Sequence, residues 1–137
     1  MKKELRSLFR PLLLAVMCVS FFSCEGNNLE GNEVTFSFNL HKEYYLRHPR
    51  NSSSYVKVTK SGLSVNGENG LIVDVGDKTL SQIRQVPKSG WSKTASYYEN
   101  ESHGYIARWK DTNWDEDYYM KIYISYGIWC YYCEWNP

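Results

Sequence analysis

Strict alternation of apolar and polar residues is the feature that most constrains the fold of this chain. In segment 34–40 (VTFSFNL) every second residue is apolar, which is the period of a strand with one face on a core and the other in water. Met120, Ile122 and Ile124 repeat this spacing within segment 118–126. They predict another strand with one buried and one exposed face. No apolar spacing predicts an amphipathic helix longer than two turns, so the chain is predicted to be all-β.

Turn-forming residues separate the predicted strands at intervals of roughly ten residues. This spacing is typical of a small antiparallel β-sandwich or a partly open barrel, here of about seven strands. Residues 48–51 (HPRN) place segment 41–53 in a loop, and segment 66–70 (NGENG) predicts a tight hairpin. Segment 71–75 (LIVDV) predicts a central strand covered on both faces. Leu80 and Ile83 predict one helical turn before a proline.

The start of the chain has the three parts of an export signal. Residues 1–11 carry four basic side chains and one acidic one, and residues 12–22 form an apolar run of 11 residues. That run is too short to cross a bilayer as a helix. Ser23 and Cys24 follow this run. They resemble a lipobox, in which a small residue precedes the cysteine that becomes acylated. A signal peptide at 1–23 is therefore predicted, with palmitate or a similar chain on Cys24; an ordinary signal peptide is the alternative.

Cleavage before Cys24 sets the predicted organisation of the mature chain. Segment 24–33 is the acylated cysteine and a flexible tether, segment 34–128 is the β-domain, and segment 129–137 is an aromatic tail. Two acyl chains are enough for stable attachment, so the predicted location is the cell envelope, at the outer membrane. Removing the leader leaves 12 of 16 basic and 14 of 15 acidic residues. This balance argues against nucleic acid as a partner.

Four stretches follow one another in a recognisable order: 71–76 (LIVDVG), 83–91 (IRQVPKSGW), 103–108 (HGYIAR) and 119–123 (YMKIY). This order resembles a family of short lipoproteins of gut Bacteroidetes, which typically carry Val-Gly, then Ile-Pro-x-Ser-Gly-Trp, then Gly-His-Gly-Tyr-Val, and end in a Tyr-rich strand. Ser102 stands where the family usually has glycine. The resemblance implies a secreted β-domain with a lipid anchor, and it implies no catalytic residue.

The acidic segment 111–117 (DTNWDED) is a candidate calcium loop. Its oxygen-bearing side chains occupy alternate positions: Asp111, Asn113, Asp115 and Asp117. Ca²⁺ takes six to eight oxygen ligands, and a curled loop supplies them at such a spacing. The glycine and the final glutamate of an EF-hand are missing. A solvated hairpin tip is the alternative, since Asp and Asn favour turns. Calcium is the one cofactor that the sequence suggests.

Cys130 and Cys133 form a C-x-x-C pair in the predicted tail. In an exported protein a disulfide between them is the expected state. An extended strand would hold their Cα atoms about 10 Å apart, beyond disulfide reach, so the bridge requires a turn at residues 131–132. Free thiols are one alternative. A zinc site is another, but it needs two further ligands.

Tryptophans are candidates for a flat platform that binds sugar rings through their apolar C–H faces. The four residues concerned are Trp109, Trp114, Trp129 and Trp135. Trp114, at the tip of the acidic loop, is predicted to be exposed. The alternative is that most of these rings fill the core or cover sheet edges.

Signals for catalysis are weak in this sequence. It contains no H-E-x-x-H, no G-x-S-x-G and no phosphate-binding glycine loop. Ser102 and His103 are adjacent, but only geometry makes a nucleophile and base pair. The chain is therefore predicted to be a non-catalytic, lipid-anchored binding or accessory module whose ligand is a glycan or a protein. A structural subunit that pairs through strand edges and a small hydrolase are the alternatives.

Overall fold

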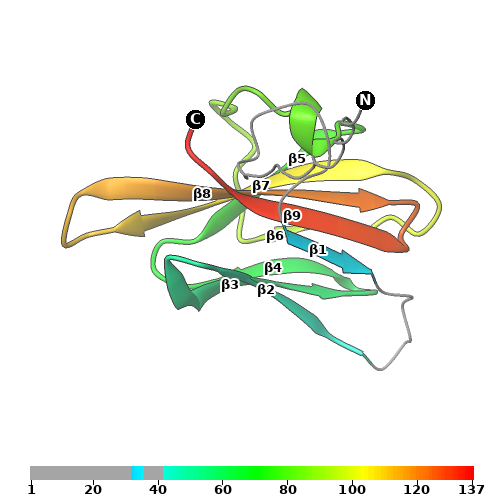
Figure 1. Ribbon diagram of the computed structural model, residues 1–137, viewed down its shortest axis with the longest axis horizontal. Coiled ribbons are helices and arrows are strands. Elements are labelled where there is room, and N and C mark those ends of the chain that lie inside the picture. Colours follow the sequence, from blue (N-terminus) through cyan, green and yellow to red (C-terminus); the bar gives the residue numbers. More distant parts are fainter. Residues whose placement is uncertain (1–31, 36–41) are drawn as a thin grey trace, which may run out of the picture.

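The computed structural model describes residues 32–35 and 42–137 as two antiparallel β-sheets (Figure 1). One sheet has five strands in the order β1-β9-β8-β7-β5, and the other has four in the order β2-β3-β4-β6. The strands are β1 (Asn32–Thr35), β2 (Tyr44–His48), β3 (Asn51–Thr59), β4 (Gly62–Asn66), β5 (Leu71–Gly76), β6 (Thr94–Ala95), β7 (His103–Asp111), β8 (Glu116–Ser125) and β9 (Trp129–Trp135). The sheets stay open, so the all-β sandwich prediction is confirmed. The described part has more strands than the seven expected.

The main core lies between the two sheets. Alternate residues of β8, from Tyr118 to Ile124, face Val56 and Val58 of β3 across it. Each fully buried aliphatic side chain contributes roughly 1.5–3 kcal/mol. Trp109 of β7 is completely buried here, and its indole N–H donates to the Asn66 carbonyl at 2.8 Å. The one polar atom of this large side chain is therefore satisfied.

A second core covers the other face of the five-stranded sheet. Segment 77–91 crosses that face and brings in Leu80 and Ile83 from the predicted helical turn, which the structure shows as a 3-10 turn, η2 (Leu80–Gln82). Lys121 of β8 is buried beneath it, where its Nζ donates to the Leu80 carbonyl at 2.9 Å. Tyr123 is buried on the same face. The prediction that β8 exposes one face to water is therefore wrong.

The first predicted loop contains a strand. Within segment 41–53, β2 runs to His48 and only Pro49 and Arg50 turn the chain back into β3. Leu46 and His48 both point inward and are almost completely buried. The strand is difficult to see in the sequence because a histidine stands at an inward position, where its ring nitrogens find hydrogen-bond partners instead of water.

Segment 66–70 is a turn between the sheets and not the hairpin predicted from its sequence. It leads from β4 in one sheet to β5 in the other. Gly67 has a φ of 123°, and a Cβ there would approach the Trp109 ring to 2.8 Å. Glycine therefore meets both a conformational and a steric requirement at this position.

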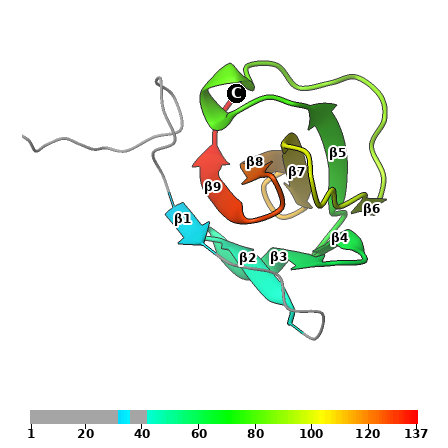
Figure 2. The ribbon, with the colours of Figure 1, turned by 90° about the vertical axis from the view of Figure 1, so that its right-hand side faces the viewer.

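The β5 strand is covered on both faces, as predicted, but it lies at the edge of its sheet and not at the centre. Ile72 exchanges backbone hydrogen bonds of 2.7 and 2.9 Å with Ser92. Two residues later, β6 pairs with β4 of the other sheet. Segment 92–95 therefore joins the two sheets along one side (Figure 2). β6 itself is limited to the two residues Thr94–Ala95.

The C-terminal segment is an integral strand and not a tail. β9 lies between β8 and β1 in the five-stranded sheet (Figure 1). The β-domain therefore continues past the predicted boundary at residue 128. Of the strand predicted at 34–40, residues 34 and 35 belong to β1, whereas 36–41 lie outside the described residues, as do the leader 1–23 and Cys24. No helix in the described part of the chain has the length and apolar character to span a membrane.

Candidate functional site

A row of four side chains crosses the outer face of the four-stranded sheet. The strand register places Tyr45 of β2 opposite Lys57 of β3, Lys57 opposite Ser64 of β4, and Ser64 opposite Thr94 of β6. Their sequence neighbours Leu46, Val56, Val58 and Leu63 are buried, and alternation along a strand therefore turns the row outward. The row presents an aromatic ring, a cation and two hydroxyl groups in a line.

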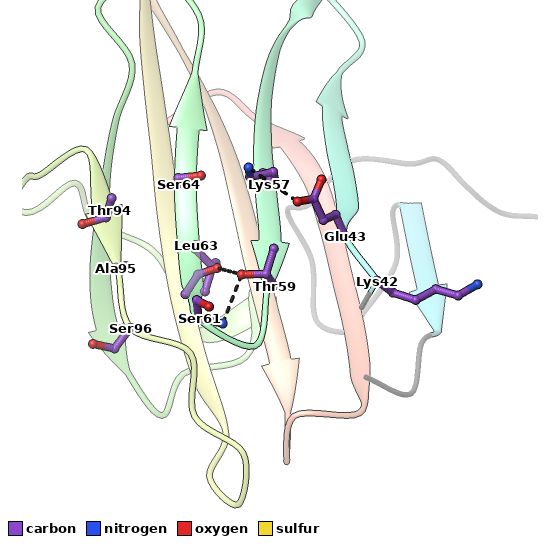
Figure 3. A pocket seen from close by; sticks show the side chains of 11 residues that line it. Lys42, Glu43, Lys57, Thr59, Ser61, Leu63, Ser64, Thr94, Ala95 and Ser96 are labelled. Carbon is purple, nitrogen blue, oxygen red and sulfur yellow. Dashed lines mark hydrogen bonds and ion pairs between the residues drawn. The ribbon is translucent and has the colours of Figure 1, made fainter. Parts of the chain in front are cut away.

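Three residues of this row, Lys57, Ser64 and Thr94, line an open groove of about 790 Å³ (Figure 3). Such a volume falls in the range of roughly 300–1,000 Å³ that is usual for ligand sites. Five of the lining side chains carry hydroxyl groups: Thr59, Ser61, Ser64, Thr94 and Ser96. Within the described part of the chain, the hydroxyls of Ser64, Thr94 and Ser96 have no hydrogen-bond partner. They are available to a ligand.

Charged side chains form one end of the groove, and aromatic rings of β2 and β3 lie beside it. Lys57 and Glu43 point toward each other there, with Nζ and Oε2 3.8 Å apart (Figure 3). The hydroxyl of Tyr45 donates to Glu43 at 2.5 Å. This hydrogen bond raises the pKa of Tyr45. The Arg47 guanidinium carbon lies 4.8 Å from the centre of the Tyr55 ring. This end combines hydrogen-bonding groups with exposed aromatic surface.

A second cluster surrounds His103 at the start of β7. Its Nδ1 lies 3.0 and 3.1 Å from the two carboxylate oxygens of Asp74 on β5, and its Nε2 lies 2.9 Å from Glu101. The ring of Tyr98 stacks on the imidazole, with the centroids 3.7 Å apart and the planes within 9° of each other. Because each nitrogen faces an acceptor, this geometry suits an imidazolium that donates twice.

Electrostatics favour the charged form of His103. Partial burial opposes the charge, but hydrogen bonds and attraction from Asp74 and Glu101 outweigh it and raise the pKa of His103. In the charged form both nitrogens donate, and the ring then has no lone pair for a metal or for a substrate proton. The adjacent Ser102 hydroxyl is bonded to a different partner: its Oγ accepts a hydrogen bond from the Tyr126 N–H at 3.2 Å. The cluster is therefore built as a charged link between β5 and β7.

A second hollow, of about 920 Å³, lies between β5 and segment 78–90. Polar and apolar side chains share its walls, and Asp74, which lines it, is already bound to His103. Ser89 is the one hydroxyl-bearing residue among those that line it, so this hollow offers fewer hydroxyl groups than the groove on the four-stranded sheet. We take the groove as the candidate functional site.

The four tryptophans do not come together as a platform. Trp109 and Trp135 are buried, with 0% and 6% of their surface exposed. Trp114 is 75% exposed, as predicted, and Trp129 is 46% exposed, but they lie at opposite ends of β8. The predicted aromatic platform is therefore wrong, because these four residues do not share one surface. Composition alone does not distinguish buried rings from exposed ones.

The four side chains of the acidic loop do not converge on a common point. Asp111 accepts from the Asn113 N–H at 3.0 Å, and Asp115 forms an ion pair of 2.9 Å with Lys110. Asp117 pairs across the hairpin with Lys110, on the opposite strand. No group of three or more acidic, histidine or cysteine side chains in the described residues is placed to share a metal ion. The loop is a hairpin tip.

The two cysteines of β9 are not joined to each other. Cys130 is a free, buried thiol, whereas Cys133 is disulfide-bonded. The predicted bridge is wrong because β9 is extended through both positions, and residues three apart in a strand face opposite sides of the sheet. Cys130 points into one core and Cys133 into the other. The chain's remaining cysteines, Cys18 and Cys24, lie outside the described residues.

The sequence analysis did not single out the groove residues Lys57, Ser64 and Thr94, or Tyr45 beside them. The local signal existed, since residues 55, 57 and 59 alternate with the apolar Val56 and Val58. Their convergence depends on the register of four strands, which no local pattern reveals. Compared with protein-family models, with curated proteins and with solved structures, the chain matches none.

Proposed function

We propose that this chain is a non-catalytic binding module of the cell envelope, held to the outer membrane by lipid on Cys24, and that it binds a glycan in the groove on the four-stranded sheet. The observation that supports the ligand class is the row of Tyr45, Lys57, Ser64 and Thr94. Glycans present hydroxyl groups together with apolar C–H faces, and sites that bind them combine hydrogen-bonding groups with aromatic rings.

Filling the groove tests the proposed ligand site. Ser64→Tyr places a large ring at the centre of the row, on an outward position where tyrosine suits a strand. Ser53→Tyr is the matched control, because Ser53 is exposed on the same strand face as Lys57 but does not line the groove. On a glycan array, we expect Ser64→Tyr to lose at least tenfold in binding and Ser53→Tyr to keep it. Equal binding by both variants would exclude this groove.

The surroundings of the two histidines within the described residues favour binding over hydrolysis. His103 holds both ring nitrogens against carboxylates. His48 is buried between the sheets, with its nitrogens occupied by backbone groups of Arg50 and Tyr119. A general base needs a nitrogen within reach of a substrate proton. Neither histidine offers one in this arrangement.

The lipid anchor is tested by the mass and the first residue of the mature protein. Lipoprotein purified from its native cells should begin at Cys24 and carry a mass increase for acyl groups, because two acyl chains are what stable attachment requires. A mature chain that keeps Met1 at its start, or that carries no fatty acid on its first residue, would overturn the anchor.

A second candidate function is assembly with other envelope proteins through a strand edge. The strand β2 favours it, because in the described part of the chain β2 pairs on one side only, with β3. An unpaired edge presents backbone groups that another strand can extend. Co-purification with an envelope protein that persists in the Ser64→Tyr variant would favour this function over glycan binding.

A further inference from the structure

Exposed apolar side chains cluster in the turn between β8 and β9. Among the described residues, three of the five large apolar side chains that face solvent lie here: Tyr126 at 63%, Ile128 at 46% and Trp129 at 46% exposure. The other two, Tyr45 and Trp114, lie in other parts of the molecule. Single exposed apolar residues are ordinary, but a cluster of them marks an interaction surface. We call these three residues the β8–β9 tip.

The backbone of the tip adopts a conformation that its sequence does not favour. Tyr126 and Gly127 have positive φ values of 50° and 70°, and the Ile128 N–H donates to the Ser125 carbonyl at 2.9 Å. These are the features of a type I′ hairpin turn, whose first central position favours Asn, Asp or Gly. A tyrosine there is held in an unfavourable region of φ. Such strain indicates that the side chain is retained for a purpose other than stability.

The inner side of the tip is fixed against loop 96–102, which connects β6 and β7. The Tyr97 hydroxyl donates to the Gly127 carbonyl at 2.8 Å, and the Tyr126 N–H donates to Ser102 Oγ at 3.2 Å. A Cβ on Gly127 would lie 2.8 Å from the Glu99 carbonyl oxygen. The turn is therefore packed on one side and presents its apolar side chains on the other.

The N-terminal strand ends beside this tip. β1 pairs with β9 so that Thr35 lies opposite Trp129 and Asn32 opposite Tyr132 (Figure 1). The eight residue steps from Cys24 to Asn32 span at most about 28 Å. Three residues along β9 separate Asn32 from the tip, which is about 10 Å. A lipid on Cys24 would thus keep the β8–β9 tip within reach of the membrane surface.

We infer that the β8–β9 tip inserts into the surface of the bilayer that holds the lipid anchor. This inference rests on the proposed anchor at Cys24. Trp and Tyr favour the interface between lipid headgroups and hydrocarbon, where an apolar ring with a polar edge is suited to both sides. Ile128, between them, supplies a purely apolar side chain. The membrane is the partner that the anchor keeps beside this tip.

Charges around the tip permit contact with lipid. The two nearest loop carboxylates are both paired with cations: Glu99 with Lys60 at 2.6 Å, and Glu101 with His103 at 2.9 Å. The loop therefore presents little uncompensated negative charge to lipid headgroups. At the far end of β8, the β7–β8 hairpin with Trp114 projects beyond the other strands (Figure 1). In the inferred orientation this hairpin points away from the membrane.

Fluorescence quenching by lipid tests the inference, with two exposed tryptophans as a matched pair. The lipidated protein is placed in vesicles of phosphatidylethanolamine and phosphatidylglycerol, with and without bromine atoms on the acyl chains. Bromine quenches indole emission nearby. We expect quenching in the wild type, loss of most of it in Trp129→Phe, and no loss in Trp114→Phe. Tyr126→Asn should reduce quenching while raising the unfolding midpoint, because asparagine suits the positive φ.

The outcomes separate the tip from the anchor. Protein that floats with vesicles but shows no quenching, or that loses quenching equally in Trp129→Phe and Trp114→Phe, overturns the tip inference and leaves the anchor standing. Protein that does not float with vesicles shows that the anchor itself is wrong. A dimer in detergent that disappears in Trp129→Phe, without quenching in vesicles, assigns the tip to a second copy of the chain and also overturns the inference.

Discussion

Two histidines hold distant parts of this sandwich together, in opposite ways. His48 lies between the sheets, 1% exposed, where its Nδ1 accepts from the Arg50 N–H at 3.0 Å and its Nε2–H donates to the Tyr119 carbonyl at 3.0 Å. That pattern requires a neutral ring. His103 lies at the start of β7 between two carboxylates, which is a pattern for a charged ring.

The comparison shows that partners, and not burial alone, set the charge of a histidine. Burial lowers the pKa of His48, and the carbonyl of Tyr119 offsets this only in part. Burial also acts against a charge on His103, yet the two carboxylates reverse the result and raise its pKa. The same side chain therefore serves as a neutral link inside the core and as a charged link at its border.

Removing each ring should give the largest difference between the two regions. His48→Ala leaves a cavity beside Trp109 and Tyr118, which stack edge-on against the ring, and it leaves two backbone groups without partners. We expect a loss of about 2–4 kcal/mol in unfolding free energy. For His103→Ala we expect less than about 1 kcal/mol, since water screens its partly exposed ion pairs. Urea denaturation measures both.

The control for this pair is the slope of the denaturation curve. If both variants keep the wild-type slope with urea, the change in midpoint reports stability alone. Equal losses in the two variants would contradict the distinction between a core link and a border link.

The pH dependence of stability should separate the two histidines next. The folded pKa of His103 lies above the ordinary value of 6.5, so its contribution is complete below that pH and is lost as pH rises through the folded pKa. The folded pKa of His48 lies below 6.5, so its contribution is complete above that pH and is lost as pH falls toward the folded pKa. In the wild type the two trends oppose each other.

Each alanine variant should expose the trend of the histidine that remains. His103→Ala should become more stable as pH rises between about 5 and 8, and His48→Ala should become less stable, with slopes of at most about 1.4 kcal/mol per pH unit. The remaining histidine, His41, lies outside the described residues and is common to both variants, so it cancels in their difference. Parallel pH profiles for the two variants would contradict the assignment of charge.

The strands β8 and β2 also differ in how well the sequence predicts them. Alternation of Met120, Ile122 and Ile124 predicted β8, because an apolar period of two is a local property. β2 was missed because its inward positions are Leu46 and His48, and the ring of His48 is acceptable in the core only with partners 71 residues away on β8. The hydrogen bonds that permit its burial are not visible in the sequence.

The candidate sites were harder to predict than the strands. His103 was singled out in the sequence, but its partner Asp74 is 29 residues away, and only the pairing of β5 with β7 brings them together. Trp109 could have been assigned to the core, since Tyr105 and Ala107 precede it at alternate positions of the same strand. Without strand register, its aromatic ring was instead grouped with Trp114, which is exposed.

The smallest expected difference lies within the His103 cluster itself, between its two carboxylates. Asp74 approaches Nδ1 with both oxygens and its side chain is 27% exposed, whereas Glu101 uses one oxygen and is 66% exposed. Asp74→Asn should therefore lower the pKa of His103 more than Glu101→Gln does. At pH 6 we expect stability losses of about 0.5–1 kcal/mol for Asp74→Asn and less than about 0.5 kcal/mol for Glu101→Gln. An NMR titration of the His103 ring protons measures the pKa directly.

The choice of asparagine keeps this last comparison free of a second effect. Asp74 also accepts from the Gly76 N–H at 2.8 Å, and an asparagine side-chain carbonyl can accept the same bond. The change then removes charge next to His103 and leaves the turn at the end of β5 supported. Exposure to water is the reason for the expected order, since a screened carboxylate stabilises an imidazolium less than a shielded one. A larger pKa change in Glu101→Gln would mean that Glu101 in loop 96–102, and not Asp74 on β5, is the main partner of His103. The ion pair would then not link β5 to β7.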